Sequence, residues 1–177
     1  QYITHLVRRS FDQALGARIG DYELRLLYDV CHNIAKVEEH QVGGERRRLC
    51  VHRKGATRAF GPGSRQVPEA FRETGQPVLI PGDMQTGSYV LVGTKEAMRS
   101  SFGSTCHGAG RTMSRTSARK RIRGEKLRAR LESEASIRVR AHSMRGFAEE
   151  APFAYKRLDD VVNVVHDAGL SRRVVRT

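Results

Sequence analysis

The stretch PVLIPGDMQTGSYVLVG, residues 77–93, consists of two apolar runs separated by a polar turn. Its first six and last six residues are each bounded by glycine or proline, which predicts two short buried strands. Asp83, Thr86 and Ser88 are the polar side chains of the connection between them. Such groups suit hydrogen bonds to a nucleotide base or ribose, and they suit the capping of a tight turn equally well.

A β-hairpin is expected upstream of this pair of strands. Residues 35–42 and 45–53 flank the dipeptide Gly43-Gly44, which favours a two-residue turn with positive φ. Residues 24–35 are mostly apolar, and their pattern fits either a helix or a buried strand. Residues 136–143 alternate apolar and polar side chains, which predicts a half-buried strand.

Helices are expected in several other parts of the chain. Apolar spacing and stop signals predict them at 1–16, 94–103, 111–134 in two pieces divided at Gly124, and 155–168. Thr94 is the expected N-cap of the second, Pro152 suits the first turn of the last, and Gly169 suits its end. Strands and helices mix without a regular βαβ rhythm, so the fold class is α+β, with mixed sheets and packed helices.

The chain is strongly basic. It has 177 residues with 32 Lys or Arg against 19 Asp or Glu, a formal charge of +13. Such an excess favours a polyanionic partner such as nucleic acid or nucleotide phosphates, although a solvated basic surface explains it too. Three cysteines without CxxC spacing indicate a reducing, cytoplasmic environment rather than a disulfide framework. No run of 18 apolar residues occurs, so no membrane association is expected.

The segment GSTCHGAGR, residues 103–111, has the composition of a phosphate-binding loop. Its glycines allow close approach of a ligand and positive φ, and Arg111 offers a fork that fits phosphate oxygens. A helix beginning near Arg111 would add a favourable N-terminus. His107 can attack phosphorus through a ring nitrogen. The alternative interpretation is a tight turn between two helices.

Two further segments carry candidate site residues. His32 lies in YDVCHNIAK, residues 28–36, and taken alone it fits a satisfied interior histidine as well as a ligand. Residues 52–63 form a basic, glycine-bearing loop in which Lys54 and Arg58 suit phosphate contacts, and a solvated loop explains the charges equally well.

Six segments together resemble the RtcB family of RNA ligases. The matching segments follow the family order over almost the whole chain: YDVCHNIAKVEEH, VHRKGATRAFGPG, GQPVLIPGDM, SYVLVGT, FGSTCHGAGRTMSR and AEEAPFAYK. The resemblance implies that residues 1–177 are the carboxy-terminal part of a single RtcB-like catalytic domain, truncated at both ends. It further implies an enzyme that joins an RNA 2′,3′-cyclic-phosphate or 3′-phosphate end to a 5′-hydroxyl.

The resemblance also assigns roles to individual residues. It implies GTP and Mn²⁺ as cofactors, with His107 as the histidine that becomes guanylylated and His32 as a manganese ligand. The implied nucleotide contacts are Asp83, Ser88, Gly108, Ala109, Gly110, Arg111 and Tyr155, and the implied RNA or phosphate contacts are Lys54, Arg58 and Arg111. The implied partners are RNA and GTP, and an activating protein is a further candidate.

Some features depart from the family pattern. Gln85 and Gly87 stand where the family usually has Gly and Ala, so Gln85 is expected to crowd a glycine position. Most of the metal ligands and a closing lysine segment are absent, so the chain by itself is expected neither to ligate RNA nor to guanylylate stably. The rival hypotheses are a non-catalytic basic RNA-binding module and another histidine-dependent phosphoryl-transfer enzyme, such as a phosphatase.

Overall fold

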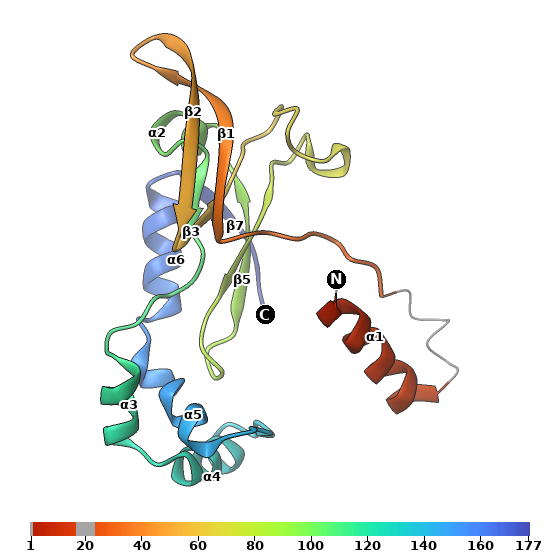
Figure 1. The fold of residues 1–177 in the computed structure, drawn as a ribbon, viewed down its shortest axis with the longest axis vertical. Coiled ribbons are helices and arrows are strands. Elements are labelled where there is room, and N and C mark those ends of the chain that lie inside the picture. The colour runs from red at the N-terminus through yellow and green to blue at the C-terminus, as the bar shows by residue number, and fades with distance from the viewer. Residues whose placement is uncertain (1, 17–23) are drawn as a thin grey trace.

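The centre of the fold is a three-stranded antiparallel sheet backed by a helix (Figure 1). The computed structural model describes residues 2–16 and 24–177. Strands β4 (Pro77–Pro81), β5 (Ser88–Gly93) and β7 (Ser171–Arg176) form the sheet in the order β4-β5-β7. Helix α6 (Leu158–Asp167) packs against it, and the shared core contains Ala59, Val78, Ile80, Leu91, Ala109, Leu158, Val162 and Val165. The two predicted buried strands are therefore confirmed.

The predicted hairpin is also confirmed. Strands β1 (Asn33–Val42) and β2 (Glu45–Lys54) pair in register from Asn33 opposite Lys54 to Val42 opposite Glu45. Gly43 and Gly44 have φ of 60° and 85°, the positive values that a two-residue hairpin turn needs. In Figure 1 this hairpin extends beyond the central sheet, with its turn at one end of the molecule.

A second, smaller sheet connects the hairpin to the histidine segment. Strand β3 (Ala56–Arg58) follows β2 after one residue and pairs antiparallel with β6 (Ser104–Cys106). Between them lie η2 (Glu69–Phe71), the strands β4 and β5, and helix α2 (Lys95–Ser100). The Thr94 hydroxyl accepts a hydrogen bond from the Ala97 amide at 3.0 Å, which confirms the predicted N-cap.

Residues 115–154 form a separate group of short helices, the helical lobe. It consists of α3 (Arg115–Arg121), α4 (Gly124–Glu134), α5 (Met144–Glu149) and the 3₁₀ helix η3 (Pro152–Ala154). The lobe has its own core of Leu127, Leu131, Val139 and Ala151, onto which Met84 packs from the β4–β5 turn. Gly124 divides the basic stretch into two helices as predicted.

Three sequence predictions are wrong. Within the segment 24–35, residues 24–32 form neither helix nor buried strand but an irregular, mostly exposed stretch, and only residues 33–35 are in a strand, at the start of β1. Residues 136–143 form no strand, because Val139 is buried against the helices of the lobe rather than in a sheet. The last helix begins at Leu158 rather than near Pro152, which lies in η3. Gly169, with φ of 70°, does follow its end.

Helix α1 (Tyr2–Leu15) confirms the prediction for residues 1–16, yet none of its residues is buried. In Figure 1 it lies apart from the sheets and the lobe. Among the described helices, none has the length and apolar character that crossing a bilayer requires. With helices and antiparallel sheets in one chain, the α+β fold class is confirmed.

Candidate functional site

The two histidines singled out in the sequence lie against one another. The imidazole rings of His32 and His107 are stacked, with centroids 4.6 Å apart and planes inclined by 11°. His32 immediately precedes β1, and His107 immediately follows β6. Asn33, next to His32, pairs with Lys54 at the end of β2, and Ala56, at the start of β3, pairs with Cys106, next to His107. The two strand pairings therefore bring both histidines together.

Apolar contacts hold the histidine segment in position. Ala109 is 6% exposed within the core of the central sheet, and Cys106 packs against the same core. Burial raises the pKa of the Cys106 thiol, which keeps it protonated and makes it a poor metal ligand. The side chain of His107 therefore projects from a segment anchored on both sides.

Two glycines of this segment have the expected positive φ. Gly103 has φ of 63°, and a Cβ at this position would overlap the Phe60 ring. Gly110 has φ of 74°, with open space around the place of its missing Cβ. Gly108 lies beside the end of β4, where a Cβ would be 3.5 Å from the Pro81 carbonyl oxygen. The segment thus passes next to the start of the Asp83 turn.

The electrostatics of the pair favour a neutral His107. Partial burial and the neighbouring His32 both lower the pKa of the His107 imidazole below its ordinary value. An unprotonated ring nitrogen is what both nucleophilic attack and metal ligation require. Within the described part of the chain, no third side chain joins the two histidines as a possible metal ligand. Among the described residues, no group of three or more His, Cys, Asp or Glu side chains could hold a metal ion.

Arg111 is held by protein groups rather than left open to solvent. Its guanidinium donates hydrogen bonds to Tyr155 Oη at 3.0 Å, to Glu150 Oε2 at 3.1 Å and to the Glu149 carbonyl at 2.5 Å. It also lies over the Tyr155 ring, 4.9 Å from the centroid. No helix begins at this point, since α3 starts only at Arg115, so the expected helix N-terminus beside Arg111 is wrong.

Glu150 is the member of this network that sequence reasoning missed. Burial works to raise the pKa of its carboxyl, but hydrogen bonds from Tyr155 and Arg115 and the charge of Arg111 outweigh that and lower it. Burial and the Glu150 contact raise the pKa of the Tyr155 hydroxyl. The sequence offered one signal, the acidic pair Glu149-Glu150 in AEEAPFAYK. The pair does not indicate which basic residues it contacts.

Asp83 caps the β4–β5 turn. Its Oδ1 accepts hydrogen bonds from the amides of Gln85 at 2.8 Å and Thr86 at 3.1 Å, and its Oδ2 accepts one from the Thr86 hydroxyl. Ser88 begins β5, and its backbone carbonyl accepts a hydrogen bond from the Thr177 amide. Gln85 does not adopt positive φ, so its backbone conformation does not require glycine.

The three basic residues around β2 and β3 have different surroundings. Lys54 is exposed at the end of β2 and stands opposite Asn33, next to His32. Arg58 donates to Gln76 Oε1 at 3.2 Å and lies over the Phe60 ring. Arg53, from the same basic stretch, is only 2% exposed and bonds Glu38, so it offers nothing to an outside phosphate.

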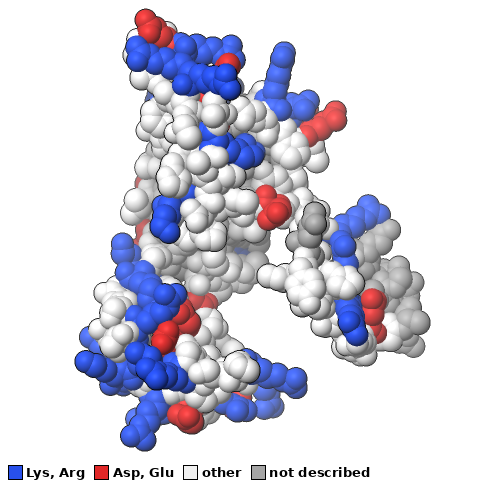
Figure 2. All heavy atoms as spheres, viewed as in Figure 1, with Lys and Arg blue, Asp and Glu red and all other residues white. Residues whose placement is uncertain are grey.

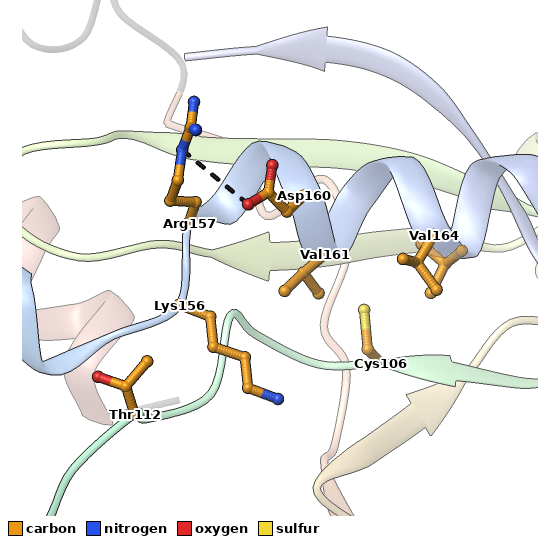
Figure 3. Close-up of a pocket in the computed structure, with 8 residues that line it drawn as sticks. Cys106, Thr112, Lys156, Arg157, Asp160, Val161 and Val164 are labelled. Carbon is orange, nitrogen blue, oxygen red and sulfur yellow. Dashed lines mark ion pairs between the residues drawn. The ribbon is translucent and has the colours of Figure 1, made fainter.

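A cavity of about 580 Å³ lies beside the histidine segment, between it and α6 (Figure 3). Val161 and Val164 of α6 face it, and the Cys106 side chain points toward them. Lys156 and Thr112 border it near the start of α6. Neither His107 nor His32 is among its lining residues, so the cavity lies next to the histidine pair but does not include it.

Comparison with known proteins identifies the family. The family model described as tRNA-splicing ligase RtcB matches residues 1–177. Three relatives carry the same name: a protein of Archaeoglobus fulgidus is 57% identical over 99% of this chain, one of Thermococcus kodakarensis 54% over 99%, and one of Pyrococcus abyssi 54% over 99%. The chain covers 36% of the first two relatives and 19% of the third, so it spans about a third of their length or less. The chain belongs to the RtcB family of tRNA-splicing ligases.

Proposed function

We propose that the protein containing this chain is a GTP- and Mn²⁺-dependent RNA ligase that joins 2′,3′-cyclic-phosphate or 3′-phosphate ends to 5′-hydroxyl ends. The observation that carries the proposal is the stacking of His32 on His107, within a glycine-bearing segment of an RtcB-family chain. The substrate is RNA, either tRNA halves or broken RNA, and the reaction is proposed to occur in the cytoplasm, where cysteines stay reduced.

The chemistry assigned to His107 is attack on the α-phosphorus of GTP. Its neutral ring nitrogen forms a bond to phosphorus while the bond to the bridging oxygen of the β-phosphate breaks, so pyrophosphate leaves. A 2′,3′-cyclic phosphate is first opened by water to a 3′-phosphate. GMP then passes from the nitrogen to an oxygen of the RNA 3′-phosphate. The RNA 5′-hydroxyl finally attacks that phosphate, which releases GMP and closes the phosphodiester.

His32 is proposed to hold the metal beside the nucleophile. An imidazole nitrogen is a ligand that Mn²⁺ accepts, so the chemistry of His32 suits that ion, although one donor does not complete a coordination shell. When bound, the ion would neutralise phosphate charge and so favour the departure of pyrophosphate. The lowered pKa of the His107 imidazole supports the nucleophilic role of His107, because it favours an unprotonated ring nitrogen near neutral pH.

The remaining assignments differ in how the surroundings support them. Lys54 is exposed near His32, which supports a phosphate contact. Arg58 and Arg111 already have protein partners, so a phosphate contact there would share or replace those hydrogen bonds. Asp83, Ser88 and Tyr155 stay proposed contacts of the guanosine, and Gly108, Ala109 and Gly110 stay proposed neighbours of its phosphate.

Transfer of label from α-³²P-GTP to the complete protein in the presence of Mn²⁺ tests the proposal. The parent protein is expected to retain label through denaturing electrophoresis, and chelation of the metal is expected to abolish labelling. The His107→Ala variant is expected to take up none. The His166→Ala variant, which changes a histidine on α6, is expected to label like the parent, and equal labelling of both variants would contradict the assignment.

The two rival functions give different results in the same assays. A phosphatase would release phosphate from an ester without GTP, and a non-catalytic RNA-binding module would bind RNA with steep salt dependence and be indifferent to His107. The ligase proposal expects ligation to require GTP and His107 together.

A further inference from the structure

The positive charge of the chain is concentrated on the helical lobe. Residues 115–154 contain eleven Lys or Arg against five Glu. Figure 2 shows Lys and Arg side chains gathered over this lobe and at the turn of the β1–β2 hairpin. Several arginines of the lobe are paired with glutamates, including Arg115, Arg119 and Arg128. A concentration of this kind raises the local concentration of polyanions.

One groove of the lobe combines unpaired cations with apolar surface. It has a volume of about 570 Å³ and is lined by residues of α3 and α4 and by Phe153 of η3. Arg121 and Lys126 border it, and neither side chain forms a hydrogen bond or an ion pair with another described residue. Arg130, one helical turn after Lys126, and Glu134 also line the groove, but they pair with each other at 2.9 Å, so the unpaired cations of the rim are Arg121 and Lys126.

The apolar part of the groove includes an aromatic ring that is open to solvent. Phe153 is 37% exposed, and Ile122 and Ala129 line the same groove. Cations that follow a phosphate backbone, together with an aromatic face for an unpaired base, are the two features of grooves that bind single-stranded nucleic acid. An apolar peptide would leave the cationic rim unpaired, and duplex RNA would leave the ring unused.

The groove is joined directly to the histidine segment. The Thr112 amide donates to the Ala154 carbonyl at 2.8 Å, and the Lys156 amide donates to the Gly110 carbonyl at 2.9 Å. These bonds fix η3, and therefore Phe153, against the residues that follow His107. Phe153 is thus tied by backbone hydrogen bonds to the segment that carries His107, which makes the groove a candidate path for an RNA strand whose end lies at His107.

We propose that this groove binds a single-stranded segment of the RNA substrate, with a base stacked on Phe153 and phosphates bound by Arg121 and Lys126. The proposal rests on the RNA ligase function for the identity of its partner. It adds a binding surface outside the reacting site.

Fluorescence anisotropy of a dye-labelled single-stranded RNA, bound to the complete protein over a range of salt concentrations, tests the groove. The Arg121→Gln/Lys126→Gln variant is expected to bind several-fold more weakly at low salt. The slope of log affinity against log salt is expected to fall by about 0.7 for each phosphate that the variant no longer neutralises. The control is Arg47→Gln/Arg48→Gln at the hairpin turn, which removes the same charge and is expected to leave the slope unchanged.

Phe153 is tested by two substitutions of different character. Phe153→Leu keeps an apolar side chain but loses the aromatic face, and it is expected to weaken binding about five-fold or more. Phe153→Tyr keeps the ring and is expected to bind like the parent. Melting temperatures of all variants are compared with that of the parent. The side chain of Lys126 is exposed and has no partner among the described residues, so Lys126→Gln alone is expected to melt like the parent and to test binding without a change in folding.

Three results would contradict the proposal that the groove binds single-stranded RNA. They are an equal loss of affinity in the groove and hairpin variants, an unchanged affinity of Phe153→Leu, and competition by duplex RNA as strong as that by single-stranded RNA. The transfer of GMP label separates this outcome from the fate of the ligase function. Normal labelling with unaffected RNA binding contradicts the groove only. Absence of labelling in the parent, with RNA binding weakened in the groove variants, contradicts the ligase function and supports the groove.

Discussion

Arg53 joins the long hairpin to the turn that leads into the histidine segment. Its guanidinium donates to both carboxylate oxygens of Glu38, at 2.9 and 2.8 Å, and also to the Phe102 carbonyl and the Ser104 hydroxyl. His40 contributes a further hydrogen bond to Glu38 at 3.0 Å. Glu38, His40 and Arg53 are each 4% exposed or less. The cluster thus fixes the position of β6, and of His107 one residue after it.

Replacing Arg53 with leucine is expected to destabilise the protein strongly. The change leaves the Glu38 carboxylate buried without its main partner, which costs about 3–5 kcal/mol in comparable sites. Arg47→Leu, in the same strand, breaks an exposed pair with Glu45 and is expected to cost about 1 kcal/mol or less. Urea unfolding of the two variants provides the measurement, and similar small losses in both would contradict the role given to Arg53.

The lowered pKa of the Glu38 carboxyl implies that the protein loses stability in acid. Burial works to raise the pKa of its carboxyl, but hydrogen bonds from Arg53 and His40 outweigh that and hold it below the ordinary value of 4.5. As the pH falls below 4.5, the unfolded chain takes up a proton before the folded protein does, so stability is lost. Thermal melts of the parent should show this loss, and Glu38→Gln should reduce it. An identical acid profile in the two proteins would show that Glu38 does not contribute.

The packing of α4 against α5 depends on a glycine. A Cβ at Gly124 would overlap the carbonyl of Met144, at the start of α5. Gly124→Ala is therefore expected to separate the two helices and lower the melting temperature. Gly146→Ala, within α5, is the matched control, because a Cβ at Gly146 would lie 3.7 Å from its nearest neighbour, the Ser143 Cβ, which is ordinary van der Waals contact. That variant should be neutral or more stable, by up to about 1 kcal/mol.

The elements that the sequence predicted correctly have local causes. The Gly43-Gly44 turn, the Thr94 cap and the apolar runs that became β4 and β5 each depend on residues close in the chain. The errors have non-local causes. Val139 alternates with polar residues like a strand residue but is buried against α4, and β7 is an Arg-rich segment that becomes a strand only by pairing with β5.

At the scale of the whole molecule, two cores meet around the candidate site. The central sheet and α6 hold the histidine segment through Ala109, and the lobe holds it through the contacts of Arg111 with Glu149 and Glu150. The sequence predicted His32 and His107 as site residues through family resemblance. Their stacking could not follow from periodicity, since it depends on strand pairings that connect residues far apart in the chain.

The central claim is that His107 carries GMP. Peptide mass spectrometry of the complete protein after incubation with GTP and Mn²⁺ tests it most directly, since it locates the modified residue. A single GMP adduct is expected on the peptide containing residues 103–111, assigned to His107 by fragmentation. An adduct on another residue, such as Lys156 beside the same segment, or no adduct in a protein that still ligates RNA, would contradict it.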